Sequence, residues 1–334
     1  MLKRNFIFQL FALVILATGF TAITKADVRF VSGRSALKIP FKLYNNHIYL
    51  QVGVNNSKPF WFLLDTGAPN IINDGNAKTL NLKLTPAGQT SGVGENSADV
   101  SLAENVSFTL PGTVYKERKV AVVSLESVEE CANEIAVDLQ GKIALRKQPL
   151  KGDEHQPIDG VLGDAFFKNL VVEIDYAAQF INLYEPKTYR YPGAGKVIPL
   201  ELTDNHIYVR APLKASKQSS VNGRFMIDSG SMLALILNRP FIEKNNLLPP
   251  KEQTTAFDVC GIGGYSKTQI GAIENLQLEK LNLGSLVTVF SQATNGVLTR
   301  TDFDGVIGNA ILRLYKVVFD YSRKQMILES TSKK

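Results

Sequence analysis

Cysteine and histidine are scarce in this chain, and several motifs that indicate metal or cofactor chemistry are missing. Its 334 residues include two cysteines, Cys131 and Cys260, and three widely separated histidines. Two distant thiols do not make the disulfide framework of a small secreted domain, and the sequence leaves open whether they pair. C-x-x-C, H-E-x-x-H, G-x-S-x-G and P-loop motifs are absent. The sequence therefore gives no support to a zinc enzyme, a serine hydrolase or a P-loop enzyme, and we interpret the histidines as ordinary strand or loop residues.

Charge of one sign is also limited. The chain has 37 Lys and Arg against 31 Asp and Glu, a formal net charge of +6. Residues 1–26 hold three of the bases and no acid, so the remainder has 37 − 3 = 34 bases against 31 acids, or +3. These bases form no run of the kind that binds phosphates. The sequence therefore argues against a nucleic acid partner.

One apolar run stands out, at the N-terminus, and it is short. Met1–Arg4 is basic, Phe6–Phe20 is apolar, and Thr24–Ala26 resembles a small-x-small cleavage site. This pattern predicts a signal peptide over residues 1–26 and a mature chain that starts at Asp27. The run is shorter than the roughly 20 residues of a spanning helix, although an uncleaved anchor is the alternative. We expect an exported protein, periplasmic or secreted, with no stable membrane span after signal removal.

What the sequence does contain is a long internal repeat. Four segments of the first half recur in the same order in the second: His47–Tyr49 as His206–Tyr208, Phe62–Gly67 as Phe225–Gly230, Asp159–Gly163 as Asp304–Gly308, and Val171–Tyr176 as Lys316–Tyr321. The last two segments have equal spacing, since 175 − 159 = 16 and 320 − 304 = 16. The repeat predicts two homologous lobes, residues 27–190 and 191–334. The boundary is placed in the turn-rich stretch 185–196, which is alternatively a surface turn inside one lobe.

Residue patterning indicates short strands and few helices. Strands are expected at Ile48–Val54, whose even positions share one apolar face, at Phe60–Leu64, and as closing strands of the two lobes at Phe180–Tyr184 and Gln325–Leu328. Short helices are expected at Asp164–Asn169 and Pro240–Asn246. The polar stretch from Glu126 to Pro157 has a shorter counterpart in the second half, so we interpret it as an insertion on the first lobe.

Two tripeptides inside the repeat carry the candidate chemistry. They are Asp65-Thr66-Gly67 and Asp228-Ser229-Gly230, each directly after an apolar strand. A carboxylate at the end of a buried strand is costly unless it is paired, and a glycine two positions later permits a tight turn. The hydroxyl between them can bond to the opposing backbone. Asp-Gly turns are common in general, but two copies inside one longer repeat argue against a coincidence.

Two such turns that face each other would bring the carboxylates to hydrogen-bonding distance. Two like charges that close do not ionise independently, so one proton is shared. The ionised carboxylate can then take a proton from a bound water while the protonated one donates to a substrate carbonyl. This arrangement predicts acid–base hydrolysis with Asp65 and Asp228 as the catalytic residues.

With these motifs the chain resembles the pepsin and retropepsin superfamily of aspartic proteases. In that family each lobe supplies one D-[T/S]-G and, later, an apolar-apolar-Gly strand, which Val161–Gly163 and Val306–Gly308 match. The resemblance extends from about Tyr44 to Leu328. It implies an all-β fold of two mostly antiparallel, barrel-like lobes with a cleft between them. It also implies an endopeptidase that acts on a peptide or protein and needs no cofactor or metal. Because two lobes in one chain remove the need for a catalytic dimer, we expect a monomer. The shared proton is a known property of these proteases and is carried over as such.

Members of the superfamily cover the cleft with a glycine-rich hairpin, or flap. Candidates here are Ser91–Glu95, with Gly92 and Gly94, and Cys260–Tyr265, with Gly261, Gly263, Gly264 and Tyr265. Either is alternatively a plain surface hairpin. The first hairpin lacks the tyrosine that pepsins carry there. This departure keeps a second function open, that of a catalytically weak or inactive protein that binds peptides. A solute-binding protein is disfavoured, because those proteins are usually α/β.

Overall fold

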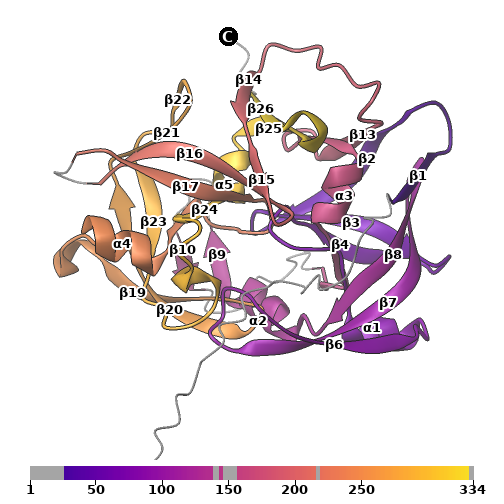
Figure 1. Cartoon of the computed structure of the whole chain (residues 1–334), viewed down its shortest axis with the longest axis horizontal. Coiled ribbons are helices and arrows are strands. Elements are labelled where there is room, and N and C mark those ends of the chain that lie inside the picture. Colours follow the sequence, from indigo (N-terminus) through magenta and orange to yellow (C-terminus); the bar gives the residue numbers. More distant parts are fainter. Residues whose placement is uncertain (1–25, 138–142, 146–155, 216–218, 331–334) are drawn as a thin grey trace, which may run out of the picture.

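The computed structural model describes residues 26–137, 143–145, 156–215 and 219–330. The expected signal segment falls almost wholly outside these residues, as does much of the expected insertion. The described chain is mostly strand with few helices and forms two large sheets, which confirms the all-β, two-lobed prediction. In Figure 1 most of the first half, in indigo and purple, lies to the right, and most of the second half, in orange and yellow, lies to the left. No described helix is long and apolar enough to cross a membrane.

The elements of the first half are strands β1 (Asp27–Phe30), β2 (Ser35–Tyr44), β3 (His47–Val54), β4 (Phe60–Leu64), β5 (Ile71–Asn73), β6 (Leu84–Ser91), β7 (Ser97–Leu110), β8 (Thr113–Val123), β9 (Ile135–Val137), β10 (Ile143–Leu145), β11 (Gly160–Leu162), β12 (Val171–Asp175) and β13 (Phe180–Tyr184). Its helices are α1 (Asp74–Thr79), α2 (Glu126–Glu134) and α3 (Asp164–Asn169). The predicted strand at 60–64 and the predicted helix at 164–169 therefore have the expected bounds.

The elements of the second half are strands β14 (Lys196–Pro199), β15 (Glu201–Thr203), β16 (His206–Lys214), β17 (Val221–Asp228), β18 (Leu235–Leu237), β19 (Thr255–Gly261), β20 (Gly264–Ile273), β21 (Asn275–Leu278), β22 (Leu281–Asn282), β23 (Leu286–Ser291), β24 (Gly305–Gly308), β25 (Tyr315–Asp320) and β26 (Gln325–Ser330). Its helices are α4 (Arg239–Asn245) and α5 (Asn309–Leu312), with short 3₁₀ turns η1 (Lys251–Gln253), η2 (Val297–Thr299) and η3 (Tyr321–Arg323). The helix predicted at 240–246 is present, but it begins and ends one residue earlier.

The same local arrangement occurs in both halves. In the first, β4 lies parallel to β11, with Phe62 opposite Gly160. In the second, β17 lies parallel to β24, with Phe225 opposite Gly305. In each case the strand that leads into the tripeptide therefore runs beside the apolar-apolar-Gly strand of the same half. This matches the order of the sequence repeat.

A shared sheet joins the two halves, in the strand order β14-β26-β25-β12-β13-β2. Its central pair is antiparallel β12 and β25, with Val172 opposite Phe319. The predicted closing strands are present as β13 and β26, but they lie in this one sheet rather than each closing its own lobe. Strand patterning shows which face of a strand is apolar but does not identify its partner strand.

Aromatic side chains from the two halves also pack against each other. Phe166 and Phe167 of α3 are fully buried. The ring of Phe167 lies 5.3 Å from that of Phe319 and 5.7 Å from that of Tyr321, both from the second half. Each buried phenylalanine side chain contributes about 1.5–3 kcal/mol to folding. Strand β3 shows the expected alternation. The side chains at positions 48, 50, 52 and 54 belong to the largest hydrophobic cluster of the protein, whereas Tyr49 packs in a separate apolar cluster.

Candidate active site

Both tripeptides lie where the two halves meet. Asp65 follows β4, and Asp228 is the last residue of β17. The Asp65 N–H donates to the Leu162 carbonyl of β11 at 3.0 Å, and Asp228 lies opposite Gly308 of β24. Each aspartate is therefore positioned by the parallel strand pair of its own half. Both side chains border the same cavity between the lobes.

The hydroxyl residues interlock the two turns. The Thr66 N–H donates to Ser229 Oγ at 3.0 Å, and the Ser229 N–H donates to Thr66 Oγ1 at 3.0 Å. Thr66 Oγ1 also donates to the Ile227 carbonyl at 2.8 Å, and Ser229 Oγ donates to the Leu64 carbonyl at 2.9 Å. Thr66 and Ser229 are both fully buried. Each half thus satisfies buried backbone groups of the other, which fixes the relative position of the turns.

The glycines leave room for the opposite carboxyl. A Cβ added to Gly67 would lie 2.7 Å from Asp228 Cγ, and one added to Gly230 would lie 2.2 Å from Asp65 Cγ. Both distances are far below van der Waals contact. The glycine in each tripeptide is therefore needed for two reasons. It leaves room for the aspartate of the other half, and it permits the tight turn of its own half.

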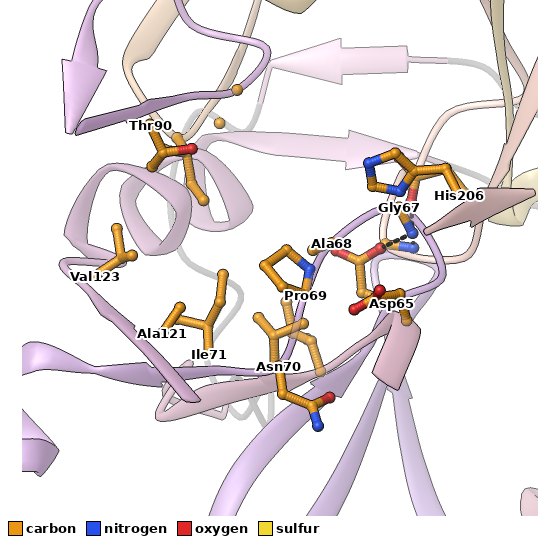
Figure 2. Close-up of a pocket in the computed structure, with 18 of the residues that line it drawn as sticks. Asp65, Gly67, Ala68, Pro69, Asn70, Ile71, Thr90, Ala121, Val123 and His206 are labelled. Carbon is orange, nitrogen blue, oxygen red and sulfur yellow. Dashed lines mark hydrogen bonds between the residues drawn. The ribbon is translucent and has the colours of Figure 1, made fainter. Parts of the chain in front are cut away.

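The two carboxyls form one coupled pair. The Gly67 N–H donates to Asp65 Oδ1 at 2.7 Å, the dashed contact in Figure 2, and the Gly230 N–H donates to Asp228 Oδ1 at 2.8 Å. The carboxyls also hydrogen-bond to each other. Burial raises the pKa of both, and the negative charge of Asp228 raises the pKa of Asp65 further. Two carboxyls in this arrangement do not ionise independently of each other.

The glycines of the support strands allow close packing on the turns. A Cβ on Gly163 would lie 2.1 Å from the Ala68 carbonyl oxygen, and one on Gly308 would lie 2.2 Å from that of Leu233. Asn70 adds a link on the first side, since its Oδ1 accepts from the Gly163 N–H at 2.5 Å. The apolar-apolar-Gly strands thus pack directly against the two turns.

Sequence reasoning missed a group that holds the second turn from the other lobe. His47 Nε2 donates to the Gly230 carbonyl at 2.8 Å, and Asn46 Nδ2 donates to the Met232 carbonyl at 2.8 Å. Asn309 Nδ2 in turn donates to the Asn46 carbonyl. Asn46 and His47 are almost fully buried. The recurring His-Ile-Tyr could have pointed to this group, but from the sequence alone it was interpreted only as part of the repeat.

Sequence reasoning also missed a partly buried carboxyl, that of Glu117 of β8, which borders the cavity. Asn70 Nδ2 donates to Glu117 Oε2 at 2.5 Å, and the Tyr115 hydroxyl donates to the same oxygen at 3.3 Å. Burial raises the pKa of Glu117 to about 7. Nothing in its local sequence distinguishes it from the charged surface residues that follow on the same strand.

The aspartates open onto a cavity of about 1400 Å³. Apolar side chains of the first half on its wall include Leu63, Ile71, Ala121, Val123, Ile158 and Val161. Those of the second half include Tyr208, Met226, Leu233, Ile236, Phe303 and Val306. Figure 2 shows Ile71, Ala121 and Val123 on one side of the view and Asp65 and His206 on the other. The cavity is large enough for several residues of an extended peptide.

Both predicted hairpins are present, and their tips meet. The β6–β7 and β19–β20 hairpins are connected by backbone hydrogen bonds from Gly94 N–H to the Ile262 carbonyl at 3.1 Å and from Asn96 N–H to the Gly263 carbonyl at 3.0 Å. A third bond joins the Val297 N–H to the Gly92 carbonyl at 3.1 Å. Two hairpins, one from each half, therefore meet at the cavity that holds the aspartates.

The predicted flap residues have different positions. Two of the glycines, Gly92 and Gly261, line the cavity, and three lie at or beside the tip contact: Gly94, Gly263 and Gly264. Tyr265 differs from the prediction. It is 46% exposed and is not among the cavity-lining residues, although its carbonyl accepts from the Glu95 N–H at 3.3 Å. As the second residue of β20, after the Ile262-Gly263 turn, it contributes its backbone carbonyl to the contact between the two hairpins.

The β19–β20 hairpin is hydrogen-bonded to α2, a helix that lies in the expected insertion. Ser127 Oγ donates to the Gly261 carbonyl at 3.1 Å. Cys260, one residue earlier, is disulfide-bonded. The side chain of Cys131, the other cysteine of the chain, lies outside the described residues. Helix α2 therefore contacts the β19–β20 hairpin close to its tip.

Gly94→Ala is expected to separate the flap tips. A Cβ at this position would lie 2.2 Å from the backbone carbon of Gly263, which cannot move without breaking the tip contact. Backbone amides at both tips are expected to exchange with deuterium at least about tenfold faster, because their hydrogen bonds open more often. Gly75→Ala is the control, since a Cβ there has no atom within 4 Å. Equal exchange in Gly94→Ala and the wild-type chain would show that the contact does not hold the flaps.

Within the described residues, no group of three or more His, Cys, Asp or Glu side chains is arranged to hold a metal ion. The cavity chemistry that the structure does present is the coupled carboxyl pair, backbone donors and apolar walls.

Comparison with known proteins agrees with this geometry. Residues 50–166 match a family model described as aspartyl protease. The match includes the first tripeptide and the first support strand, whereas the second tripeptide is placed by the structure and the repeat. No curated protein matches the chain.

Proposed function

Because residues 50–166 belong to an aspartyl protease family of the pepsin/retropepsin-like clan, we propose that the protein is an aspartic endopeptidase that uses Asp65 and Asp228. The observation that carries the proposal is the coupled carboxyl pair, held by interlocked turns at the base of a covered cavity. A protein that only binds peptides has no chemical need for two carboxyls that share a proton.

The mechanism follows from the shared proton. The ionised carboxylate accepts a proton from a water molecule between the two aspartates, and that water attacks the carbonyl carbon of the peptide bond. The protonated carboxyl donates its proton to the carbonyl oxygen, which gives a tetrahedral diol. The proton taken from water then passes to the departing nitrogen. As the carbon–nitrogen bond breaks, one hydroxyl of the diol returns its proton to the second aspartate and becomes the carbonyl of the new carboxyl group, so the pair recovers its starting protonation state.

Substrate selection is expected to favour apolar side chains on both sides of the cleaved bond. The cavity has an apolar wall from each half, and the aspartates lie where the halves meet. Burying one apolar side chain contributes about 1.5–3 kcal/mol, or roughly tenfold to a hundredfold in affinity. Sequencing the products of a diverse peptide mixture checks this. Cut sites that are predominantly polar on either side would contradict it.

The same experiment tests the proposed function. The chain from Asp27 is incubated with the peptide mixture from acid to neutral pH, and new termini are identified by mass spectrometry. Cleavage that disappears in Asp65→Asn and in Asp228→Asn supports the endopeptidase. A folded chain that binds peptides but cuts none at any pH would favour a catalytically weak or inactive peptide-binding protein instead.

We further propose that the protein is exported to a periplasm or secreted and acts as a monomer on a peptide or protein substrate. Export is supported by the signal pattern of residues 1–26 and by the disulfide at Cys260, because disulfides persist in oxidising compartments. A monomer is sufficient, because one chain supplies both aspartates.

A further inference from the structure

Glu117 is a carboxyl on the wall of the cavity, and its two oxygens have different surroundings. Its Oε2 accepts from Asn70 Nδ2 at 2.5 Å and from the Tyr115 hydroxyl at 3.3 Å. Its Oε1 has no hydrogen-bond partner among the described residues and is accessible rather than enclosed by protein atoms. Asn70 and Tyr115 therefore fix the orientation of the carboxyl, and Oε1 is left for a group that enters the cavity.

Glu117 shares a face of β8 with part of the apolar wall. Side chains alternate between the two faces of a strand, so those of Tyr115, Ala121 and Val123 lie on the face of Glu117, and all four residues border the cavity. Glu117 and Ala121 are four residues apart, which is about 13 Å along a strand. An extended peptide that packs against the wall at Ala121 therefore reaches Glu117 about four residues further along its own chain.

The charged groups around Glu117 leave it without a cationic partner. On α3, Asp164 and Lys168 form an ion pair with each other at 3.4 Å. On β8, Arg118 is exposed, and Lys119 makes no ion pair with Glu117. Since Asp164 and Lys168 offset each other, the uncompensated charge at this end of the cavity is the negative charge of an ionised Glu117.

We propose that Glu117 is a specificity-determining residue, whose carboxylate binds the cationic side chain of an arginine or lysine of the peptide substrate. This inference rests on the proposed function for the nature of the substrate. It adds to the expected apolar preference, which concerns the residues beside the cleaved bond, whereas Glu117 serves a position further along the peptide. A hydrogen bond between two charged groups is stronger than a neutral one, and a carboxylate that is already oriented loses little freedom when it forms.

The test compares peptides that carry arginine with the same peptides that carry citrulline, which is neutral and has nearly the same shape. A fluorescent peptide from the best cut site is made with either residue at each position in turn. Dissociation constants are measured by anisotropy at pH 8 in the Asp65→Asn background, where cleavage does not interfere. At one position arginine is expected to bind about tenfold more tightly than citrulline, the gain of one charge-assisted hydrogen bond.

Glu117→Gln is expected to reduce this ratio to about one, because its amide oxygen still accepts from Asn70 but carries no charge. Glu117→Lys is expected to reverse the preference, so that glutamate binds more tightly than glutamine at the same position of the peptide. Glu252→Gln, at an exposed position of η1, is the matched control and is expected to keep the wild-type ratio.

The ratio is also expected to depend on pH. Burial raises the pKa of Glu117 to about 7, and the charge of Asp164 adds to this effect. The hydrogen bonds from Asn70 and Tyr115 and the charge of Lys168 oppose it. A carboxyl with this pKa is neutral at pH 5 and charged at pH 8. The preference for arginine is therefore expected to fall from about tenfold at pH 8 to about one at pH 5.

A purely structural role makes a different prediction. If Glu117 only holds Asn70 in place, Glu117→Gln changes the affinity for the arginine and citrulline peptides by the same factor, and their ratio stays the same. An unchanged ratio in Glu117→Gln would overturn the inference, and so would a wild-type ratio of about one at every position.

The proposed function fails separately, if the wild-type chain cuts no peptide. The arginine and citrulline peptides are then designed on members of the mixture that the chain retains, and the ratio still decides the role of Glu117. A folded chain that neither cuts nor retains any peptide would overturn both proposals.

Discussion

Asp65→Asn and Asp228→Asn are each expected to reduce peptide cleavage by about 1000-fold or more while the chain stays folded. An amide cannot accept the proton of the attacking water or share the proton of the pair, and acid–base groups contribute roughly 100- to 10,000-fold to a rate. The amide is nearly the same size, so the turns and their backbone hydrogen bonds are expected to persist. Initial rates on a fluorogenic peptide, with circular dichroism as a check on folding, measure the effect.

Asp74→Asn is the matched control, because Asp74 lies on α1 and makes an exposed ion pair with Lys78. It is expected to keep the wild-type rate. Wild-type rates in either Asp65→Asn or Asp228→Asn would show that the pair does not carry the reaction.

The same variants are expected to change how stability depends on pH. Folding raises the pKa of both Asp65 and Asp228 above their ordinary value of 3.8. A raised pKa favours the protonated form in the folded state, so the folded chain loses stability as pH rises from about 4 through the pKa values of the pair. Either asparagine variant removes part of this loss. The decrease in unfolding free energy between about pH 4 and pH 7 is therefore expected to be smaller than in the wild-type chain.

Ser229→Ala is expected to destabilise the fold by about 2–4 kcal/mol. It removes the acceptor for the Thr66 N–H and the donor to the Leu64 carbonyl, and each buried group left unsatisfied costs roughly 1–3 kcal/mol. Activity is expected to fall less than in the aspartate variants, about 10- to 100-fold, because the hydroxyl positions the turns and does not exchange protons with substrate. Urea unfolding and initial rates measure the two effects.

Ser229→Thr is the conservative control, since the equivalent position of the first half is threonine and the hydroxyl is retained. It is expected to keep most of the stability. Ser219→Ala, at an exposed position, checks that the loss is specific to the buried site. A loss below about 0.5 kcal/mol in Ser229→Ala, the usual range of surface substitutions, would show that the interlock does not stabilise the fold.

The aspartates could be predicted from sequence because the evidence was local and occurred twice. Asp65 and Asp228 each stand at the end of an apolar strand with a hydroxyl and a glycine after them, and a buried carboxylate in that setting needs a partner. The strand Phe180–Tyr184 was also predictable, but its place in the shared sheet was not. Apolar patterning does not identify its partner strands, which are β12 and β2 of the same half, or show that β12 then pairs with β25 of the other half.

Some contacts could not be predicted from sequence because they join residues of different lobes. His47 contacts Gly230 at a sequence separation of 183 residues. The flap tips meet across a similar distance in the chain, at Gly94 and Ile262. Glu117 differs from the exposed Lys116 and Arg118 on either side in being partly buried against Asn70 and Tyr115 of its own lobe. No local signal distinguishes such positions, because their chemistry comes from tertiary packing.

A peptide chain has a direction, from its amino to its carboxyl end, whereas a site built from two identical halves would have none. Such a site would accept the same peptide in two opposite orientations with equal affinity. The two halves of this chain are not identical: Asn46 donates to the Met232 carbonyl of the opposite lobe whereas its counterpart Asn205 contacts Lys168, and Asp164 stands where the second half has Asn309. Under the proposed function, such differences are expected to favour one orientation of the bound peptide over the other.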